Sequence, residues 1–211
     1  MSSIEVPTLK TQRLILRPFS LEDADEVYRN FASDEQVTRF LAFDPPRNVS
    51  EARDTINTWC MYCSVPAYFH WAIELIPLGE VIGSLRGIVT EATSVASLDA
   101  CIGRPWWNQG LMTEALAAVM PFFFNTLSIS CLTACHHPDC PAAGHILRNF
   151  GFQPEGIRRR QGYSNQGVYD EICYSLLRSE YEQIQEDPDR ALWETLYAEC
   201  EFISGCEKIS G

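Results

Sequence analysis

The chain has 211 residues, of which 46% are hydrophobic and 21% are charged, and its formal net charge is −12. This length suits one compact domain with a sizeable core, and no apolar run approaches the ~18 residues that a membrane helix needs. A surface this acidic repels nucleic-acid phosphates and attracts cations such as amines, so we expect a soluble protein that binds neither nucleic acid nor membranes.

The N-terminal residues lack the charged-then-apolar layout of a signal peptide, so we expect a cytoplasmic protein. Nine cysteines are scattered along the chain, several of them in apolar runs. Free cysteine behaves there as a small hydrophobe, and in a reducing compartment we expect thiols rather than disulfides.

Hydrophobic periodicity and turn residues predict elements in the order β-α-α-β-β-β-α-β-α-β-β, a mixed α/β sheet with packed helices. In chain order, they are expected at residues 11–18, 21–31, 51–62, 68–75, 81–89, 95–103, 111–124, 129–135, 141–150, 152–159 and 168–177. Ser20 and Asp23 form a capping box before the first helix. Pro121 is expected to kink the third helix near its end.

The C-terminal segment differs from the rest of the chain. Residues 179–211 hold nine acidic and two basic residues. Residues 187–203 are predicted to form a helix with one apolar face, which packs either on the domain or on a second subunit of a homodimer. This face contains Leu192, Trp193, Leu196, Tyr197, Cys200 and Ile203. We therefore divide the chain into a domain at residues 1–178 and an acidic helical extension at residues 179–211.

The stretch WWNQGLMTEA, residues 106–115, joins a predicted strand to a predicted helix. The first turn of a helix has unpaired N–H groups and a partial positive charge, and both favour a phosphate. Gly110 lets the backbone approach a ligand closely. Thr113 and Glu114 either cap the turn or face that ligand. One glycine before a helix is also consistent with a simple tight connection, and spacing alone leaves both interpretations open.

The whole pattern resembles the GNAT superfamily of acyl-CoA-dependent N-acetyltransferases, in particular its ribosomal-protein N-terminal (RimJ/RimL-like) branch. The resemblance runs from about Leu9 to Leu177. It is carried by five segments: LKTQRLILRPFSLEDADEVY, HWAIEL with GEVIGSL, CIGRPWWNQGLMTEAL, CPAAGHILRNFGFQPEG and YDEICYSLL. The implied fold is a mostly antiparallel sheet that splays apart to admit acetyl-CoA, with flanking helices.

The resemblance also implies the cofactor site. The N–H groups of residues 109–113 would cradle the pyrophosphate of acetyl-CoA, and the strand containing Cys101 and Ile102 would pair with the pantetheine arm. Trp106 and Trp107 would form a wall beside the turn. The implied cofactor-binding residues are Cys101, Ile102, Gln109, Gly110, Leu111, Met112, Thr113, Cys140 and Ala143.

Three positions depart from the pattern of the family. Met112 replaces a small residue in the phosphate turn. The second cofactor segment, usually N-P-x-S, reads Cys140-Pro141-Ala142-Ala143. In some relatives that serine donates a proton to the leaving thiolate, and Ala143 has no group to do so. The general acid is then Cys140, another side chain or solvent.

The resemblance implies an N-acetyltransferase in which an amine attacks the thioester directly. The acceptor is a peptide or small-molecule amine, and the sequence does not choose between a protein N-terminus and a small cationic amine. Asp99, on the strand before the turn, is the candidate base, and Cys140 is the second catalytic candidate. Asp170 is expected to make a structural hydrogen bond. Tyr163 and Tyr169 are further candidate proton donors.

Besides a protein-interaction module built on the acidic C-terminal helix, two alternatives remain. The segment 135–140, CHHPDC, looks like a metal site, but adjacent histidines in an extended segment point in opposite directions and no second cluster accompanies it. We expect no metal. The loss of the family's Asn and Ser at Cys140 and Ala143 favours the other alternative, a non-catalytic acyl-CoA-binding sensor.

Overall fold

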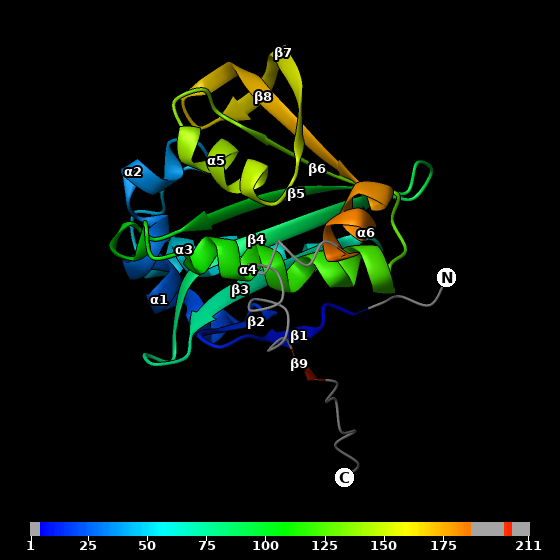
Figure 1. Ribbon diagram of the computed structural model, residues 1–211. Helices are drawn as coiled ribbons and strands as arrows, with labels where there is room; N and C mark the ends of the chain where they lie inside the picture. The colour runs from blue at the N-terminus through cyan, green and yellow to red at the C-terminus, as the bar shows by residue number, and fades with distance from the viewer. Residues whose placement is uncertain (1–4, 187–200, 204–211) are drawn as a thin grey trace.

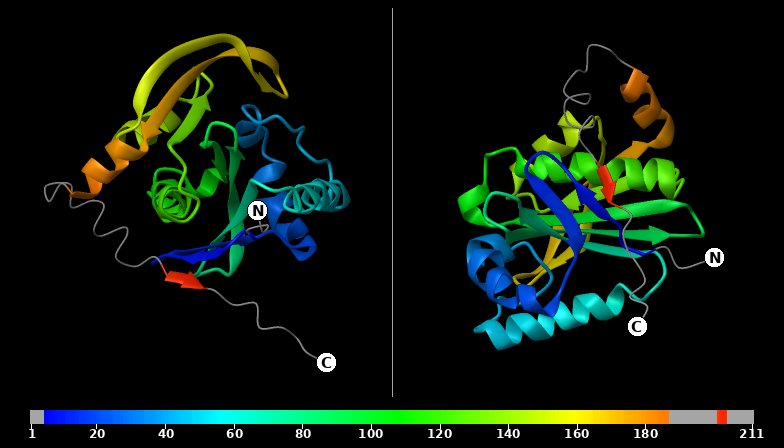
Figure 2. Two further views of the ribbon diagram at one scale, coloured as in Figure 1. Left: turned by 90° about the vertical axis from the view of Figure 1, so that its right-hand side faces the viewer. Right: turned by 90° about the horizontal axis from the view of Figure 1, so that it is seen from below.

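The computed structural model describes residues 5–186 and 201–203, and it shows a twisted sheet with helices on both faces (Figures 1 and 2). The first strands are β1 (Thr8–Lys10), β2 (Leu14–Pro18), β3 (Tyr68–Leu75), β4 (Glu80–Thr90) and β5 (Val95–Ile102). They are followed by β6 (Cys131–His136), β7 (Gln153–Ser164), β8 (Gly167–Leu177) and β9 (Glu201–Ile203). The mixed α/β sheet predicted from the sequence is confirmed.

The helices cover the sheet in two groups. The first contains η1 (Leu21–Asp23), α1 (Ala24–Val27), the π-helical turn η2 (Tyr28–Ala32), α2 (Glu35–Thr38) and α3 (Val49–Tyr62). The second contains η3 (Arg104–Trp106), α4 (Leu111–Pro121), the π-helical turn η4 (Phe122–Thr126), α5 (Pro141–Asn149) and α6 (Arg178–Glu186). Figure 2 shows α1 and α3 on one face of the sheet and α4 on the other. We call them the α3 face and the α4 face.

Strand order explains how the sheet opens. The order is β7-β8-β6-β5-β4-β3-β2-β1-β9, and all neighbours are antiparallel except β5 and β6. The parallel pairing of β5 with β6 runs from Val95 opposite Cys131 to Leu98 opposite Ala134 and then stops, although β5 continues to Ile102. We call the opening between the two strands beyond this point the wedge.

Side-chain alternation builds a core on each face. Phe69, Trp71 and Ile73 of β3 point to the α4 face and pack with the phenylalanines that follow α4. Ala72 of the same strand points to the α3 face and packs with Ile56 and other apolar residues there. Period-two burial on the strands and one apolar helix stripe on each side therefore produce a sheet buried on both faces.

Several boundaries differ from those predicted. The strand expected at residues 11–18 starts only at Leu14, as β2, because Thr11 Oγ1 and N bond to Leu14 within a turn; β1 precedes this turn and was not predicted. Pro121 is the last residue of α4, and the chain continues as the π-helical turn η4. Residues 201–203, expected in the last helix, form β9 against β1, so that end of the helix prediction is wrong.

The rest of the predicted C-terminal helix, residues 187–200, lies outside the described residues, including Leu192, Trp193, Leu196, Tyr197 and Cys200. Within the described part of the extension, residues 178–186 form α6, which packs Tyr181 and Ile184 into the main core. No helix within the described ranges is long and apolar enough to cross a membrane.

Candidate functional site

The turn before α4 has an unusual backbone. Gly110 is the N-cap of α4, with φ 75° and ψ 2°, and it follows Asn108, which has φ 59°. No side chain caps the helix, and residues 107–110 are exposed. Leu111 is buried, whereas Met112 and Thr113 are half-buried. The first N–H groups of α4 are therefore available to an anion.

Arg13 and Glu114 link this turn to the turn between β1 and β2. The buried Glu114 carboxylate accepts hydrogen bonds from Thr11 Oγ1 at 2.5 Å, Arg13 N at 2.9 Å and Arg13 Nε at 2.6 Å. Arg13 Nη1 also donates to the carbonyl of Gln109 at 3.0 Å. Glu114 thus faces the β1–β2 turn, not a ligand. Arg13 places a cation beside the phosphate turn, and sequence reasoning missed it because its partners are about a hundred residues away.

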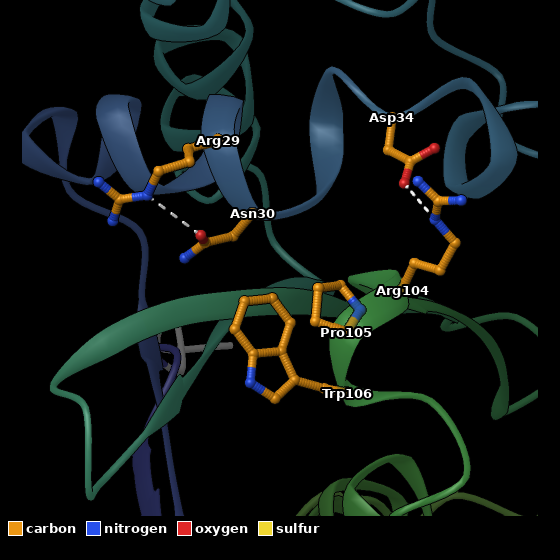
Figure 3. Close-up of a pocket in the computed structure, with 6 residues that line it drawn as sticks. All are labelled: Arg29, Asn30, Asp34, Arg104, Pro105 and Trp106. Atoms are coloured by element: carbon orange, nitrogen blue, oxygen red, sulfur yellow. Dashed lines mark hydrogen bonds and ion pairs between the residues drawn. The ribbon is translucent and has the colours of Figure 1, made fainter.

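Trp106 and Trp107 differ in their exposure and in their contacts. Trp107 is 41% exposed, and its Nε1–H donates to the carbonyl of Ile102 at 2.8 Å, so its ring folds back over the end of β5. Trp106 is half-buried against the core and lines a hollow of about 470 Å³ just before the turn (Figure 3). The hollow is also lined by Arg29, Asn30, Asp34, Arg104 and Pro105, and Arg104 Nε is paired with Asp34 at 2.8 Å.

The wedge exposes backbone groups of β5. Gly103 N–H donates to the carbonyl of Ile82 on β4. Antiparallel pairing alternates, so the backbone groups of Ile102 and Ala100 point away from β4 and into the wedge, whereas those of Cys101 point to β4. The Cys101 thiol lies 3.7 Å from Ser84 Oγ, and burial raises its pKa to about 11. Ala100 and Ile102 therefore form the open edge, and only Ile102 was singled out from the sequence.

The N-terminus of α5 lies across the wedge. Cys140 is its N-cap and makes no side-chain capping bond, and Ala143 is half-buried in its first turn. Below the helix, His136 is buried, its Nδ1–H bonds to the carbonyl of His137, and its Nε2 has no hydrogen-bond partner. A Cβ at Gly144 would come within 2.6 Å of that nitrogen, so glycine is required for α5 to pack so closely.

Asp99 lies on the α3 face of β5, beside the wedge. Its Oδ2 accepts hydrogen bonds from Arg86 Nη2 at 2.6 Å and Arg86 Nε at 3.1 Å. Arg86 stands on the neighbouring β4, directly opposite Asp99 in the register. The candidate base is thus already held in an ion pair.

Tyr169 of β8 stands among the candidate residues. Burial raises the pKa of its hydroxyl, and the nearby carboxylates of Glu171 and Asp99 raise it further. The ring lies 4.5 Å from the ring of His137, which in turn stacks on Phe40 at 4.8 Å. The Tyr169 hydroxyl therefore stays protonated and can donate a hydrogen bond, because the Asp99 carboxylate is close enough to oppose its ionisation.

Tyr163 and Asp170 lie in other parts of the β7–β8 hairpin. Tyr163 is 61% exposed near the tip of the β7–β8 hairpin. Asp170 Oδ1 accepts a hydrogen bond from Arg160 N at 2.7 Å, where β7 bulges, which confirms a structural hydrogen bond for this carboxylate.

The segment 135–140 does not converge on one point. His136 stacks on Tyr174, whereas His137 packs against Tyr169. His137 Nδ1 accepts a hydrogen bond from Asp139 N at 3.0 Å. Within the described residues, the one group of side chains close enough to share a metal ion is Cys135, Glu171 and Cys173, which joins β6 to β8.

Comparisons with known proteins agree with this arrangement. Residues 13–153 match the family model described as acetyltransferase (GNAT) domain. Uncharacterized N-acetyltransferase p20 of Bacillus licheniformis is 30% identical over 175 residues, covering 82% of this chain and 98% of the relative. Ribosomal protein uS5 alanine N-acetyltransferase of Escherichia coli (strain K12) is 25% identical over 167 residues, covering 75% of this chain and 84% of the relative.

Solved structures share the fold. The microcin C7 self-immunity acetyltransferase MccE, solved in complex with acetyl-CoA and AMP, superimposes with a TM-score of 0.71 at 18% identity. The alignment covers 79% of this chain and 93% of that one.

Proposed function

The chain belongs to the acetyltransferase (GNAT) domain family, and from this premise we propose that it transfers the acetyl group of acetyl-CoA to an amine. One observation carries the proposal: the wedge between β5 and β6 opens toward the uncapped N-terminus of α4. The uncapped helix N-terminus suits the pyrophosphate of acetyl-CoA, and the unpaired strand edge suits its pantetheine arm. The solved relative MccE, named as an acetyl-CoA complex, supports this assignment.

Each part of the chain fits one part of acetyl-CoA. The N–H groups of residues 109–113 would hold the pyrophosphate, with the Arg13 guanidinium beside them. The open edge of Ala100 and Ile102 would pair with the amide groups of the arm. The Ile102 carbonyl already accepts the Trp107 indole N–H, so its N–H is the group that remains for the arm. When bound, acetyl-CoA supplies an activated thioester.

The chain's own side chains then position and stabilise the reacting groups. Asp99, paired with Arg86, would orient the incoming amine and accept a hydrogen bond from it. The Tyr169 hydroxyl would donate a hydrogen bond to the developing thiolate. A thiol has a pKa of about 8.5, well below that of this phenol, so hydrogen bonding to the thiolate is more favourable than full proton transfer. Cys140, at the N-cap of α5, is the alternative proton donor.

We propose an α-amine as the acceptor. An α-amine has a pKa of about 7.7–8.0 and is partly neutral at pH 7, whereas a lysine amine, at about 10.4, needs a strong base. Asp99 is already paired with a guanidinium and is poorly suited to that task. The approach is also restricted, because Asn165 at the β7–β8 tip donates hydrogen bonds to the carbonyls of Thr38 and Phe43. The weak likeness to uS5 alanine N-acetyltransferase, of the RimJ/RimL-like branch, supports the same choice.

The test is acetyl-CoA binding by calorimetry, followed by thiol release with a panel of peptides with free N-termini, lysine side-chain amines and polyamines. We expect binding, and thiol release with α-amines. Release with lysine or polyamines alone would overturn the acceptor assignment. Tight binding with no release across the panel would favour a non-catalytic acyl-CoA sensor, which the loss of the family's Asn and Ser at Cys140 and Ala143 also fits. Failure to bind would overturn the proposed function.

A further inference from the structure

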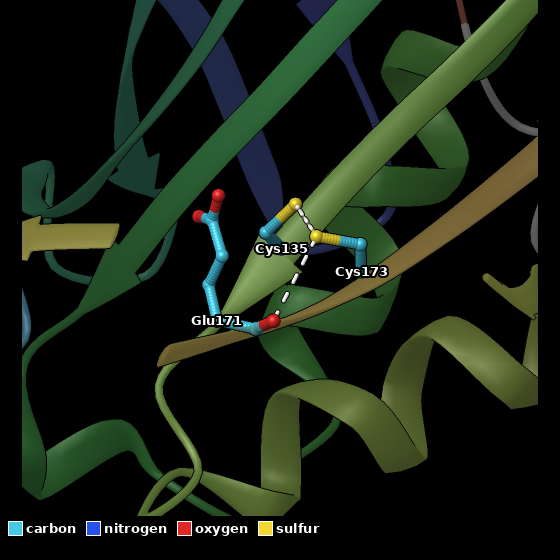
Figure 4. Close-up of side chains that lie close together, drawn as sticks. All are labelled: Cys135, Glu171 and Cys173. Carbon is cyan, nitrogen blue, oxygen red and sulfur yellow. Dashed lines mark hydrogen bonds between the residues drawn. The ribbon is translucent and has the colours of Figure 1, made fainter. Parts of the chain in front are cut away.

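Two thiols, a carboxylate and a guanidinium meet on the α3 face of the sheet, beside the wedge. Figure 4 shows Cys135 of β6 facing Cys173 of β8, with Glu171 two residues before Cys173 on the same strand. The two sulfurs lie 2.7 Å apart. Cys135 is the first residue of β6 beyond the last β5–β6 pair, at Ala134. The cluster is thus built into the strand that bounds the wedge.

The register favours a bond between these sulfurs. Cys135 and Cys173 are direct partners across antiparallel strands. Arg178 N–H bonds to the carbonyl of Ser130 at 2.9 Å, and alternation from that pair makes Cys135–Cys173 a non-hydrogen-bonded pair. Such pairs have Cα atoms about 4.5 Å apart, within the range of roughly 4.4–6.8 Å that disulfides span. The strands need little movement for the sulfurs to join.

Arg158 of β7 connects the cluster. Its Nε lies 3.0 Å from the Cys173 sulfur, and its Nη2 lies 3.1 Å from the Cys135 sulfur and 2.8 Å from Glu171 Oε1. A guanidinium stabilises a thiolate that forms beside it. Burial and the neighbouring Cys173 thiol outweigh this effect and raise the pKa of Cys135 to about 12. Cys135 is therefore a thiol at rest, with a cation in place for a transient thiolate.

We propose that Cys135 and Cys173 form a reversible disulfide by exchange with a low-molecular-weight disulfide such as glutathione disulfide. The Cys135 sulfur, after losing its proton, attacks the small disulfide and expels one thiolate, which takes up a proton. The Cys173 sulfur, after losing its own proton, then attacks the Cys135 sulfur in the mixed disulfide and expels the second thiolate. Two protein thiols are oxidised by two electrons, and one small disulfide is reduced to two thiols.

Exposure assigns the order of the two steps. Cys135 is half-buried, whereas Cys173 is 3% exposed and out of reach of a bulky oxidant. Arg158 Nε bonds to Cys173, so it stabilises that sulfur as the resolving thiolate in the second step. The resulting cross-link ties β6 to β8 at the mouth of the wedge. The guanidinium, whose side chain is 60% exposed, would lose its two thiol partners.

The experiment incubates the full chain at pH 8 with increasing ratios of glutathione disulfide to glutathione, followed by acid quench, alkylation and fragment mapping by mass spectrometry. We expect a linked fragment containing Cys135 and Cys173 that disappears on reduction. In Cys173→Ser, the mixed disulfide should accumulate on Cys135. In Cys135→Ser, Cys173 should stay reduced. Formation of the link should accelerate as the pH rises from 7 to 9, because more thiolate is present.

Cys131→Ser is the matched control, since Cys131 is buried on the same strand and faces the same side as Cys135. This variant should form the link at the wild-type rate, and far-UV circular dichroism verifies that all variants are folded. Absence of the link at every ratio, or its persistence in Cys135→Ser, would overturn the proposal. Zinc that copurifies with the protein and is lost in both single variants would instead identify a metal site. None of these measurements depends on acetyl transfer.

Discussion

Tyr169 is the hydrogen-bond donor proposed for the departing thiolate, and its hydroxyl can be removed without removing its ring. Tyr169→Phe keeps the ring contact with His137 but loses the hydrogen bond proposed for the departing thiolate. We expect kcat to fall about 100–1,000-fold, the range for removal of a single positioned donor, with acetyl-CoA affinity unchanged. Steady-state kinetics with the best α-amine and calorimetry measure the two quantities.

Tyr163→Phe on the same hairpin is the control, because that residue is 61% exposed. It should keep wild-type kinetics. Equal kcat for Tyr169→Phe and wild type would rule out the hydroxyl as a contributor and leave Cys140 or solvent as the proton donor.

Glu114 is a buried carboxylate that binds Thr11 and Arg13 and so connects the β1–β2 turn to the turn before α4. Glu114→Ala would leave the Arg13 N–H without a partner and would remove one acceptor from the Thr11 hydroxyl, which keeps its bonds to Leu14; a lost buried partner costs about 1–3 kcal/mol. Arg13 itself is partly exposed, so solvent screening makes the loss of its ion pair a smaller contribution. We expect lower stability in urea unfolding and weaker acetyl-CoA binding, because Arg13 would no longer be fixed against the Gln109 carbonyl.

Glu114→Gln removes the negative charge of this side chain but keeps its shape. Its amide oxygen can still accept from Thr11 or Arg13, so it should be more stable than Glu114→Ala. If Glu114→Ala binds acetyl-CoA as wild type does, the carboxylate supports only the fold.

At the scale of the element, the turn before α4 tests whether its left-handed glycine is needed for binding or only for folding. Gly110→Ala meets no clash, since the nearest atom to the added Cβ is Arg13 Nη2 at 3.6 Å. A left-handed conformation costs a non-glycine residue about 1–2 kcal/mol. We expect this loss of stability together with at least tenfold weaker acetyl-CoA binding, because the Cβ would occupy the approach to the N–H groups.

Gly79→Ala is a matched control for the backbone cost. Gly79 has φ 65° in the β3–β4 turn, with nothing within 4 Å of an added Cβ. This variant should lose similar stability, measured by chemical denaturation, and bind acetyl-CoA normally. Equal affinity in the two variants would mean that the turn before α4 is a connection and not a cradle.

Most helices and strands were predicted from the sequence, because the patterns that mark them involve only residues close together in the chain. Alternation identified β3, β4 and β8, and the N-cap glycine marked the start of α4. Contacts between distant segments were not predictable in this way. Arg13 beneath Gln109, and Cys135 beside Cys173, arise from strand order and register, which one sequence does not encode locally. The nearness of Asp99 to Tyr169 likewise required the relative positions of β5 and β8.

For the whole molecule, one buried histidine links stability to pH. His70 lies on the α3 face of β3, only 3% exposed, with ring contacts at 4.9 Å to Trp59 and 5.0 Å to Phe19. Its Nδ1 has no hydrogen-bond partner. Burial, helped by the positive charge of Arg86, lowers its pKa to about 3 from an ordinary 6.5. The burial of His70 is not apparent from the sequence, because a period-two strand pattern does not reveal that α3 covers this face.

The direction of the pH effect follows from the depressed pKa. The unfolded chain binds a proton at His70 below about pH 6.5, whereas the folded protein does so only below about pH 3. The stability that neutral His70 contributes is therefore complete above pH 6.5. It is lost as the pH falls from 6.5 toward 3. From pH 7 to pH 5 this single group should cost about 2 kcal/mol. His70→Leu, with similar volume and no proton to bind, should lose less stability over that interval when urea unfolding is measured at both pH values. The exposed His145, changed to Gln, should retain the wild-type slope, and a wild-type slope in His70→Leu would place the acid sensitivity in the carboxylates instead.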